Sequence, residues 1–258
     1  LNRTPDSFSD GGLFTDFDAA LRQAVKMTEE GADILDIGGE STRPGAQTVS
    51  AEQEMERVIP LIERLAHETD VPISIDTSKP EVMREAVRAG AAMINDVYAL
   101  RLPGAVEAAR ECKVPVCLMH MQGEPRSMQK NPHYKNVVAE VKQFLEERIR
   151  VCEAAGIPHT SLLIDPGFGF GKTLEHNLEL LRHLRKFTSL GQAVLVGLSR
   201  KSSIGALLGG VPSDQRLQGS VAAAVVAVLR GAHIVRTHDV KPTVEALKIA
   251  AAVREPGC

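Results

Sequence analysis

The sequence predicts an α/β protein with the fold of a (β/α)8 TIM barrel, for three reasons. Short apolar runs alternate with longer segments of helical periodicity along the whole chain. The runs are nearly continuous in hydrophobicity, as is typical of parallel strands buried on both faces. A chain of 258 residues has the length for eight strand–helix units. An open, doubly wound sheet is the alternative.

The expected strands are apolar runs that each lead into a polar residue or loop. They cover residues 32–37, 72–75, 91–94, 115–119, 162–164, 193–196 and 233–235. An eighth strand is expected to end at Leu1, so a few residues before it are expected to be missing. We expect one domain over residues 1–258, because no linker, low-complexity tract or charge block divides the chain.

The segments between the runs carry helix signals. Residues 50–68 begin with Ser50 and Gln53 at the spacing of a capping box, and apolar residues then recur at helical spacing. Residues 79–90 place proline just inside the start and glycine at the end, the usual helix boundaries. Further helices are expected over 176–187, 220–231 and 240–253.

Composition excludes several function classes. A net charge of −3 and a pI of about 6.3 provide no basic surface for nucleic acid or for an anionic membrane. The most apolar run, 221–229, is far shorter than the roughly 20 residues of a membrane span. The four cysteines show neither C-x-x-C spacing nor ligand-like pairing with the eight histidines, which disfavours zinc. We therefore expect a cytoplasmic protein with reduced thiols.

The segment IDPGFGFGKT, residues 164–173, superficially resembles a nucleotide-binding loop. That motif needs four residues between its first glycine and its Gly-Lys pair. Here Gly167 and Gly171 enclose only three residues, and Pro166 stands where glycine is required. Proline has no N–H to donate to a phosphate, so ATP binding is not expected. A role remains to be found for Asp165.

Polar residues follow most of the apolar runs, and in a barrel these positions share one face. They are Asn2, Asp36, Asp76, Asn95, His120, Asp165, Ser199, Arg200, Lys201, Arg236 and His238. Capping of strand ends explains one or two such residues, but not this many on one rim. The pattern predicts a polar pocket.

The pocket residues divide into two chemical groups. The hydrogen-bond acceptors are Asp36, Asp76, Asp165 and Asn95. They suit a flat heterocycle with several N–H groups. The donors are Lys201, Arg236 and His238, with Thr42 and Arg43 on a nearby loop. They suit a phosphate or diphosphate, so the ligand is expected to be a heterocycle with a phosphorylated arm.

Two expected βα connections, residues 2–14 and 38–50, are long and rich in Gly, Pro, Ser and Asp. Long loops on this face of a barrel are more often functional than incidental. No Ser-His-Asp or Cys-His set is recognisable, so a covalent nucleophile is not expected.

Eight segments, in order along the chain, resemble the motifs of dihydropteroate synthases. They are LNRTPDSFSDGG, DIGGESTRPGA, SIDTSKPEV, INDV, LMHMQG, DPGFGFGK, LSRKSSIG and RTHDV. The resemblance implies a TIM barrel that joins p-aminobenzoate to 6-hydroxymethyl-7,8-dihydropterin diphosphate and releases diphosphate with Mg²⁺. It also implies a cytoplasmic homodimer that binds sulfonamide inhibitors. DPGFGFGK then resembles the loop after the sixth strand, whose Asp binds the pterin.

The resemblance implies roles for individual residues. The pterin contacts are Asp76, Asn95, Asp165 and Lys201, and Arg236 and His238 form the anion pocket. Arg236 also lies over the pterin, Thr42 contacts the pterin diphosphate, and Asp36 lies near it. Phe8, Thr42, Pro44 and Ser202 line the p-aminobenzoate site, and Asn2 contacts the Mg²⁺–diphosphate. The catalytic candidates are Arg236, His238 and Lys201.

The chain departs from the family pattern at Arg3, where many members carry an apolar residue. Two alternatives stay open. One is a pterin-binding paralogue without synthase activity. The other is a tetrahydrofolate-dependent methyltransferase barrel, which lacks the STRPG loop. Diphosphate release from the pterin diphosphate separates these functions.

Overall fold

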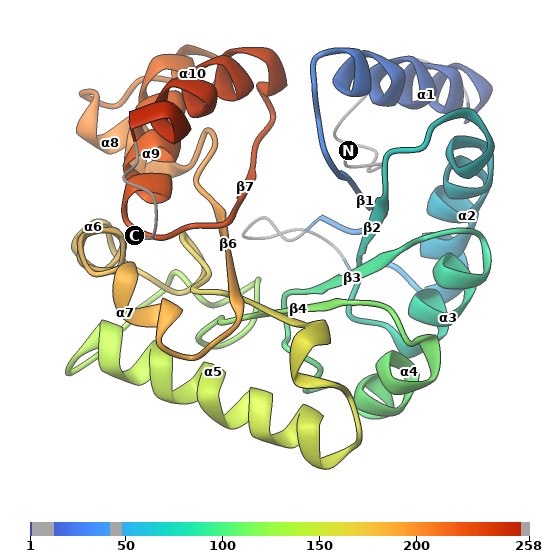
Figure 1. Cartoon of the computed structure of the whole chain (residues 1–258), viewed down its shortest axis with the longest axis horizontal. Coiled ribbons are helices and arrows are strands. Elements are labelled where there is room, and N and C mark those ends of the chain that lie inside the picture. Colours follow the sequence, from blue (N-terminus) through green and yellow to red (C-terminus); the bar gives the residue numbers. More distant parts are fainter. Residues whose placement is uncertain (2–12, 42–47, 254–258) are drawn as a thin grey trace.

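The structure is a computed structural model that describes residues 1, 13–41 and 48–253 (Figure 1). Seven parallel strands form a sheet whose order follows the chain from β1 to β7. The strands are β1 Leu35–Gly38, β2 Ile73–Asp76, β3 Met93–Asp96, β4 Val116–Met119, β5 Leu162–Asp165, β6 Ala193–Gly197 and β7 Ile234–Arg236. Each of the seven predicted apolar runs therefore contributes a strand.

The helices surround the outside of the curled sheet (Figure 1). They are α1 Leu13–Glu29, α2 Ala51–Glu68, α3 Pro80–Arg88, α4 Ala105–Cys112, α5 Val137–Ala154, α6 Leu174–Arg182, α7 Arg185–Thr188, α8 Ser202–Leu207, α9 Leu217–Leu229 and α10 Val240–Val253. A doubly wound sheet would reverse its strand order and carry helices on both faces, so that alternative is wrong. None of the helices in the described ranges is both long and apolar enough to cross a membrane.

The sheet curls until its last strand approaches its first. Arg236 at the end of β7 forms an ion pair with Asp36 of β1, 200 residues away in sequence. Leu1 lies along β1, because its carbonyl accepts the Gly38 N–H at 3.0 Å and its amine donates to the Asp36 carbonyl at 2.6 Å. The described residues thus form a curled, barrel-like sheet of seven strands.

Local signals account for several helix boundaries. Ser50 Oγ accepts the Gln53 N–H and Gln53 Oε1 accepts the Ser50 N–H, which completes the predicted capping box. Pro80 is the first residue of α3, as predicted. The single helix predicted over 176–187 is wrong, because α6 ends where the backbone at His183 leaves helical geometry (φ −108°, ψ 21°). Four helices, α1, α4, α5 and α8, lie where no helix is predicted above.

Strand alternation separates the core from the site. Ile37, Ile75 and Ile94 are fully buried neighbours on β1, β2 and β3, and they belong to the main apolar core. Successive strand residues point to opposite faces, so Asp76 and Asn95 point away from this core. The polar residues are therefore directed into the interior of the curled sheet, at its carboxyl end.

Candidate functional site

The predicted polar residues of the described chain gather at the carboxyl ends of the strands. Register places Asp76 beside Asn95 on β2 and β3, and Gly197 beside Arg236 on β6 and β7. Asp165 lies in register with Met119 of β4. Other predicted residues lie outside the described residues: Asn2, Arg3, Phe8, Thr42, Arg43 and Pro44.

Arg236 connects three strands. Its Nε donates to Asp36 Oδ2 at 2.6 Å and its Nη2 donates to Asp76 Oδ2 at 2.7 Å. Burial alone would raise the pKa of Asp36, but the Arg236 guanidinium, the Ser74 hydroxyl and the Leu1 amine together outweigh burial and hold that pKa below its ordinary value. A guanidinium has five N–H groups, so three remain beyond these two bonds. Arg236 can therefore bind an anion while it stays paired.

The pKa of Asp76 is shifted in the opposite direction from that of Asp36. Burial raises the pKa of Asp76 to about 7, although Arg236 opposes the shift, and the nearby Asp36 and Glu54 carboxylates raise it further. Two carboxylates that share one guanidinium do not both ionise readily. At neutral pH Asp76 can therefore donate or accept a hydrogen bond, and Asp36 can only accept.

Asp165 and Asn95 offer groups that the protein leaves open. Asp165 is only 6% exposed, its Oδ1 accepts the Gly167 N–H at 2.7 Å, and no described residue donates to its Oδ2. Burial raises the pKa of Asp165 to about 6. The Asn95 side chain is equally buried and makes no hydrogen bond to any residue in the described ranges. Both side chains can therefore bind the edge of a heterocycle.

The glycine-rich loop after β5 is shaped by packing against the segment that follows β4. Gly167 and Gly171 have positive φ angles of 71° and 63°. A Cβ on Gly167 would lie 1.8 Å from the His120 carbonyl oxygen, and one on Gly171 would lie 2.6 Å from that of Gln122. These approaches require glycine, so the glycines shape a turn, consistent with the rejection of a nucleotide-binding loop.

Lys201 begins α8 and lies beside this loop. Its Nζ is 4.3 Å from the centre of the Phe170 ring. Burial and the Arg236 charge lower the pKa of Lys201 to about 8, and Asp165 and Asp76 oppose this shift. Ser202, the next residue, is exposed at the start of α8. Lys201 can thus provide a cation to the pocket. Phe170 can provide an apolar wall, a role that the motif DPGFGFGK did not indicate by itself.

His238 enters the site as a neutral ring. Burial, followed by the charges of Arg236 and Arg200, lowers the pKa of His238 to about 4. Ser199 Oγ accepts the His238 backbone N–H at 3.2 Å and lies 3.0 Å from its Nδ1. The hydroxyl proton is then free to bond Nδ1, which leaves an N–H on Nε2. At pH 7 the neutral His238 ring can donate a hydrogen bond to a ligand. The ring would become positively charged only if a bound anion raised the pKa of His238.

Two residues predicted on the rim have other partners. Arg200 pairs with Asp239 through two contacts, including Nε to Oδ2 at 3.0 Å. His120 Nδ1 lies 2.9 Å from Lys172 Nζ, and burial lowers the pKa of His120 to about 2, so its ring is neutral. Each of these residues therefore holds neighbouring segments together, and its place in the pocket stays a prediction.

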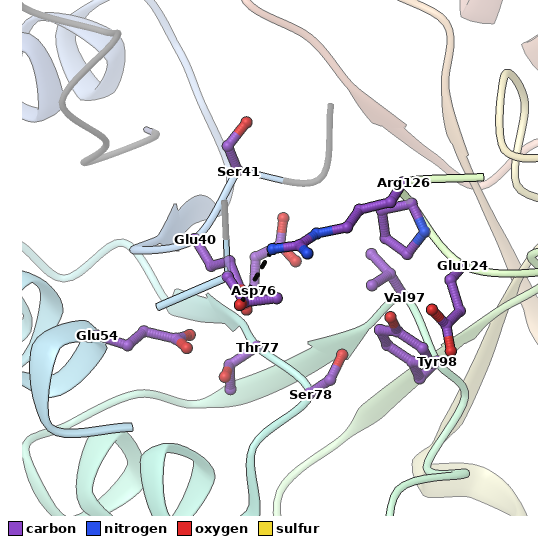
Figure 2. Close-up of a pocket in the computed structure, with 12 residues that line it drawn as sticks. Glu40, Ser41, Glu54, Asp76, Thr77, Ser78, Val97, Tyr98, Glu124 and Arg126 are labelled. Atoms are coloured by element: carbon purple, nitrogen blue, oxygen red, sulfur yellow. Dashed lines mark hydrogen bonds between the residues drawn. The ribbon is translucent and has the colours of Figure 1, made fainter. Parts of the chain in front are cut away.

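A buried ion network supports the loop after β1, and the sequence did not reveal it. Lys79 Nζ donates to Glu40 Oε2 and to Glu54 Oε2, both at 2.6 Å. Glu54 is fully buried on α2. Figure 2 shows Glu40 and Glu54 beside Asp76 in a cavity of about 170 Å³, with Arg126 extending across it. The only sign of this network in the sequence was Glu54, a charged residue at a position on α2 where the helical spacing calls for an apolar one.

The described residues do not form a metal centre. They contain no group of three or more His, Cys, Asp or Glu side chains placed to hold an ion. Asp36 and Asp76 are already bound to Arg236. A divalent cation would need ligands from the substrate or from residues outside the described ranges.

Comparisons with known proteins identify the family of this chain. Residues 1–238 match the family described as pterin binding enzymes. The dihydropteroate synthase of Escherichia coli strain K12 is 55% identical over 252 residues, which covers 98% of this chain and 89% of that protein. A solved Yersinia pestis dihydropteroate synthase in complex with a sulfonamide drug has a TM-score of 0.94 and 53% identity, over 98% of this chain and 92% of that chain.

A Xanthomonas albilineans dihydropteroate synthase, solved with 4-aminobenzoic acid, has a TM-score of 0.93 and 57% identity, over 98% of this chain and 90% of that chain. Family match, sequence identity and fold thus extend over nearly the whole chain. This chain belongs to the dihydropteroate synthase family of pterin-binding enzymes.

Proposed function

We propose that this protein condenses 6-hydroxymethyl-7,8-dihydropterin diphosphate with p-aminobenzoate to give 7,8-dihydropteroate and diphosphate. The observation that carries the proposal is the arrangement of the rim. Open acceptors, Asp165 and Asn95, share it with the cations Lys201 and Arg236, in a chain of this family. A pterin with a diphosphate arm requires both kinds of group.

The pterin ring would bind to Asp165, Asn95 and Asp76. A carboxylate accepts two parallel N–H bonds, which suits the amino-pyrimidine edge of a pterin at Asp165. The Asn95 amide has both donors and acceptors, so it can bind a second edge of the ring. Asp76 can adapt to either need, because its pKa lies near neutrality. Lys201 would contact the ring from the side of Phe170.

The diphosphate would leave before the amine attacks. The electron-rich dihydropterin ring can stabilise a cation at the exocyclic methylene, so the site's main task is to stabilise the departing anion. Arg236 has three N–H groups left for this, and His238 offers an N–H at Nε2. Fixed donors aimed at developing charge are an efficient source of catalysis. No strong general base is required.

Mg²⁺ is part of the proposal through the substrate. The described side chains do not form a ligand set for it, so its ligands would be diphosphate oxygens together with Asn2. The ion would supply additional neutralisation of the leaving group.

The p-aminobenzoate or sulfonamide would lie near Ser202 and Lys201, with Phe8, Thr42 and Pro44 completing its site. Ser202 is exposed at the start of α8, next to the buried amine of Lys201. The Lys201–Phe170 contact gives this end of the pocket both a charge and an apolar surface, which suits an aromatic carboxylate.

We extend the proposal to the whole molecule: a closed (β/α)8 barrel with long loops after its first two strands, a homodimer, and a cytoplasmic location. The two backbone bonds of Leu1 to β1 support an eighth strand at that edge. Val226, Leu229, Ile249 and Val253 on α9 and α10 are all more than a third exposed. These apolar side chains support a subunit interface there.

One assay tests the function. The protein is incubated with the pterin diphosphate, Mg²⁺ and p-aminobenzoate, and release of diphosphate and formation of dihydropteroate are measured. We expect both products in equal amounts. Pterin binding without release would support the inactive paralogue. Methyl transfer from a tetrahydrofolate, without release, would support the methyltransferase alternative.

A further inference from the structure

Lys172 is a buried cation that the proposed reaction does not use. The residue is only 3% exposed. Its Nζ lies 2.8 Å from the Gly167 carbonyl oxygen, 3.0 Å from that of Phe170 and 2.9 Å from His120 Nδ1. An ammonium has three N–H groups and no acceptor, so these three partners satisfy it completely. Such a set selects the protonated amine, although burial lowers the pKa of Lys172 to about 7.

The partners of Lys172 are the groups that hold Asp165. Gly167, whose carbonyl Lys172 binds, donates its N–H to Asp165 Oδ1 at 2.7 Å. His120, whose ring Lys172 binds, donates its backbone N–H to the Asp165 carbonyl at 2.9 Å. The ammonium therefore joins the loop after β5 to the end of β4, on either side of the carboxylate.

The hydrogen bond from the Gly167 N–H to Asp165 determines which oxygen of the carboxylate is free. Because Gly167 occupies Oδ1, a fixed Gly167 peptide leaves Oδ2 directed toward the pocket. Gly167 adopts its left-handed backbone conformation (φ 71°) without steric cost, and the bond from Lys172 to its carbonyl fixes one orientation of that peptide among those that glycine allows. A lysine that released this carbonyl would let the loop, and the carboxylate with it, turn away.

We infer that Lys172 is a positioning residue for Asp165: its ammonium fixes the Gly167 turn that orients the carboxylate, and its charge favours the ionised form that a pterin's N–H groups require. This inference rests on the proposed pterin site. The charged groups around Asp165 are Lys201, Lys172 and Arg236, and all three favour ionisation of that carboxyl. Removal of one cation should therefore make the carboxyl easier to protonate.

Binding of 6-hydroxymethylpterin, measured by titration calorimetry from pH 5 to pH 8, tests the inference. Burial raises the pKa of Asp165 to about 6, so affinity for the pterin should fall as the pH drops below that value. In Lys172→Met we expect at least about tenfold weaker binding at pH 6.5, where the Lys172 ammonium and the Asp165 carboxylate are both the major forms. We also expect the midpoint of the acid limb to move upward by about half a pH unit or more. The shift is upward because the lost charge had lowered the pKa.

Two further variants separate charge from packing. Lys172→Gln keeps a donor for the carbonyls but no charge, so it should restore part of the affinity and keep the shifted midpoint. If Lys172→Met fails to fold, the midpoint shift can be measured with Lys172→Gln instead. Phe187→Leu changes a fully buried residue of α7 and serves as the control. It should lower the stability of the protein, but leave the pterin affinity and the pH midpoint unchanged.

The outcomes distinguish this inference from the function on which it rests. If the unsubstituted protein does not bind the pterin, the proposed function fails. If it binds, and the Lys172 variants match it within twofold with the same midpoint, the inference is overturned. Weaker binding with an unshifted midpoint would also overturn it, because Lys172 would then only support packing.

Discussion

The two sides of the rim handle buried charge in opposite ways. On the side of β7, β1 and β2, Arg236 pairs directly with two carboxylates, so each of them has a cationic partner before any ligand arrives. On the side of β4 and β5, Lys172 pairs with neutral acceptors and leaves Asp165 an open oxygen. The first arrangement stabilises the sheet, whereas the second keeps a carboxylate available for binding. The difference teaches that one side of the pocket pairs its carboxylates within the protein, whereas the other leaves a carboxylate oxygen open for a ligand.

The largest expected effect comes from removal of the shared cation. Arg236→Ala should lower turnover by about 100-fold or more, because charge on the departing diphosphate would lose its main fixed donor. Binding of a pterin without the diphosphate should fall much less. Steady-state kinetics measures the factor by which turnover falls, and calorimetry measures the factor by which pterin affinity falls. Equal factors would mean that Arg236 only binds the ring.

Asp165→Asn tests the recognition side. The amide presents a donor where the carboxylate accepts, which leaves a buried mismatch of about 1–3 kcal/mol. Pterin affinity should therefore fall about 10- to 100-fold in titration calorimetry. Asp214→Asn, at an exposed aspartate, is the matched control and should bind as the unsubstituted protein does. Affinity of the Asp165 variant within twofold would remove this residue from the pterin site.

A third prediction concerns the order in which ligands bind. Thr42 is expected to contact both the pterin diphosphate and p-aminobenzoate, so the first ligand should prepare the site of the second. A sulfonamide should bind at least about tenfold more tightly when pterin, Mg²⁺ and diphosphate are present, a coupling of about 1.4 kcal/mol. Calorimetry with and without the three components measures this, and equal affinities would show a preformed site.

The remaining effects are on the free energy of unfolding, and their signs should differ between the two sides. The Asp36 pKa is lowered, so its stabilisation is present above pH 4 and is lost as the pH falls. Asp36→Asn should then destabilise the protein at pH 8. The Asp165 pKa is raised to about 6, so an ionised Asp165 opposes folding above that pH. Asp165→Asn should therefore stabilise at pH 8, on the order of 1–3 kcal/mol, and not at pH 4.

Thermal unfolding at the two pH values measures both changes. A shift of 1 kcal/mol corresponds to about 2–4 °C for a domain of this size. Shifts of the same sign in both variants at pH 8 would contradict the contrast between the two sides.

The sequence predicted the strands and the rim because both depend on local pattern. A parallel strand buried on both faces is an apolar run, and the residue that ends it, such as Asp76 or Asp165, must be on the rim. Contacts between distant segments have no local signature. The partners of Lys79 could not be read from its neighbours, since Glu54 lies 25 residues away. Lys172 follows a glycine in a familiar motif, which gives no sign that its side chain turns inward.

The helices show the same limit. Residues 50–68 carry a capping box and a clear apolar stripe, so their helix was predicted and confirmed. The break at His183 has no proline or glycine to announce it. His120 follows an apolar run as a site residue would, yet its ring serves Lys172. Residue type at a strand end identifies candidates, and only the fold decides which of them face a ligand.

The pairing of Arg236 with Asp36 has a consequence for synthesis of the protein. The two residues are 200 positions apart, so the guanidinium leaves the ribosome long after the carboxylate with which it pairs. Contacts of such separation are made late, because loop closure must precede them. A nascent chain therefore carries these two acidic side chains without their cation until β7 has been made. A product truncated before β7 would lack Arg236 and with it the main cation of the proposed anion pocket.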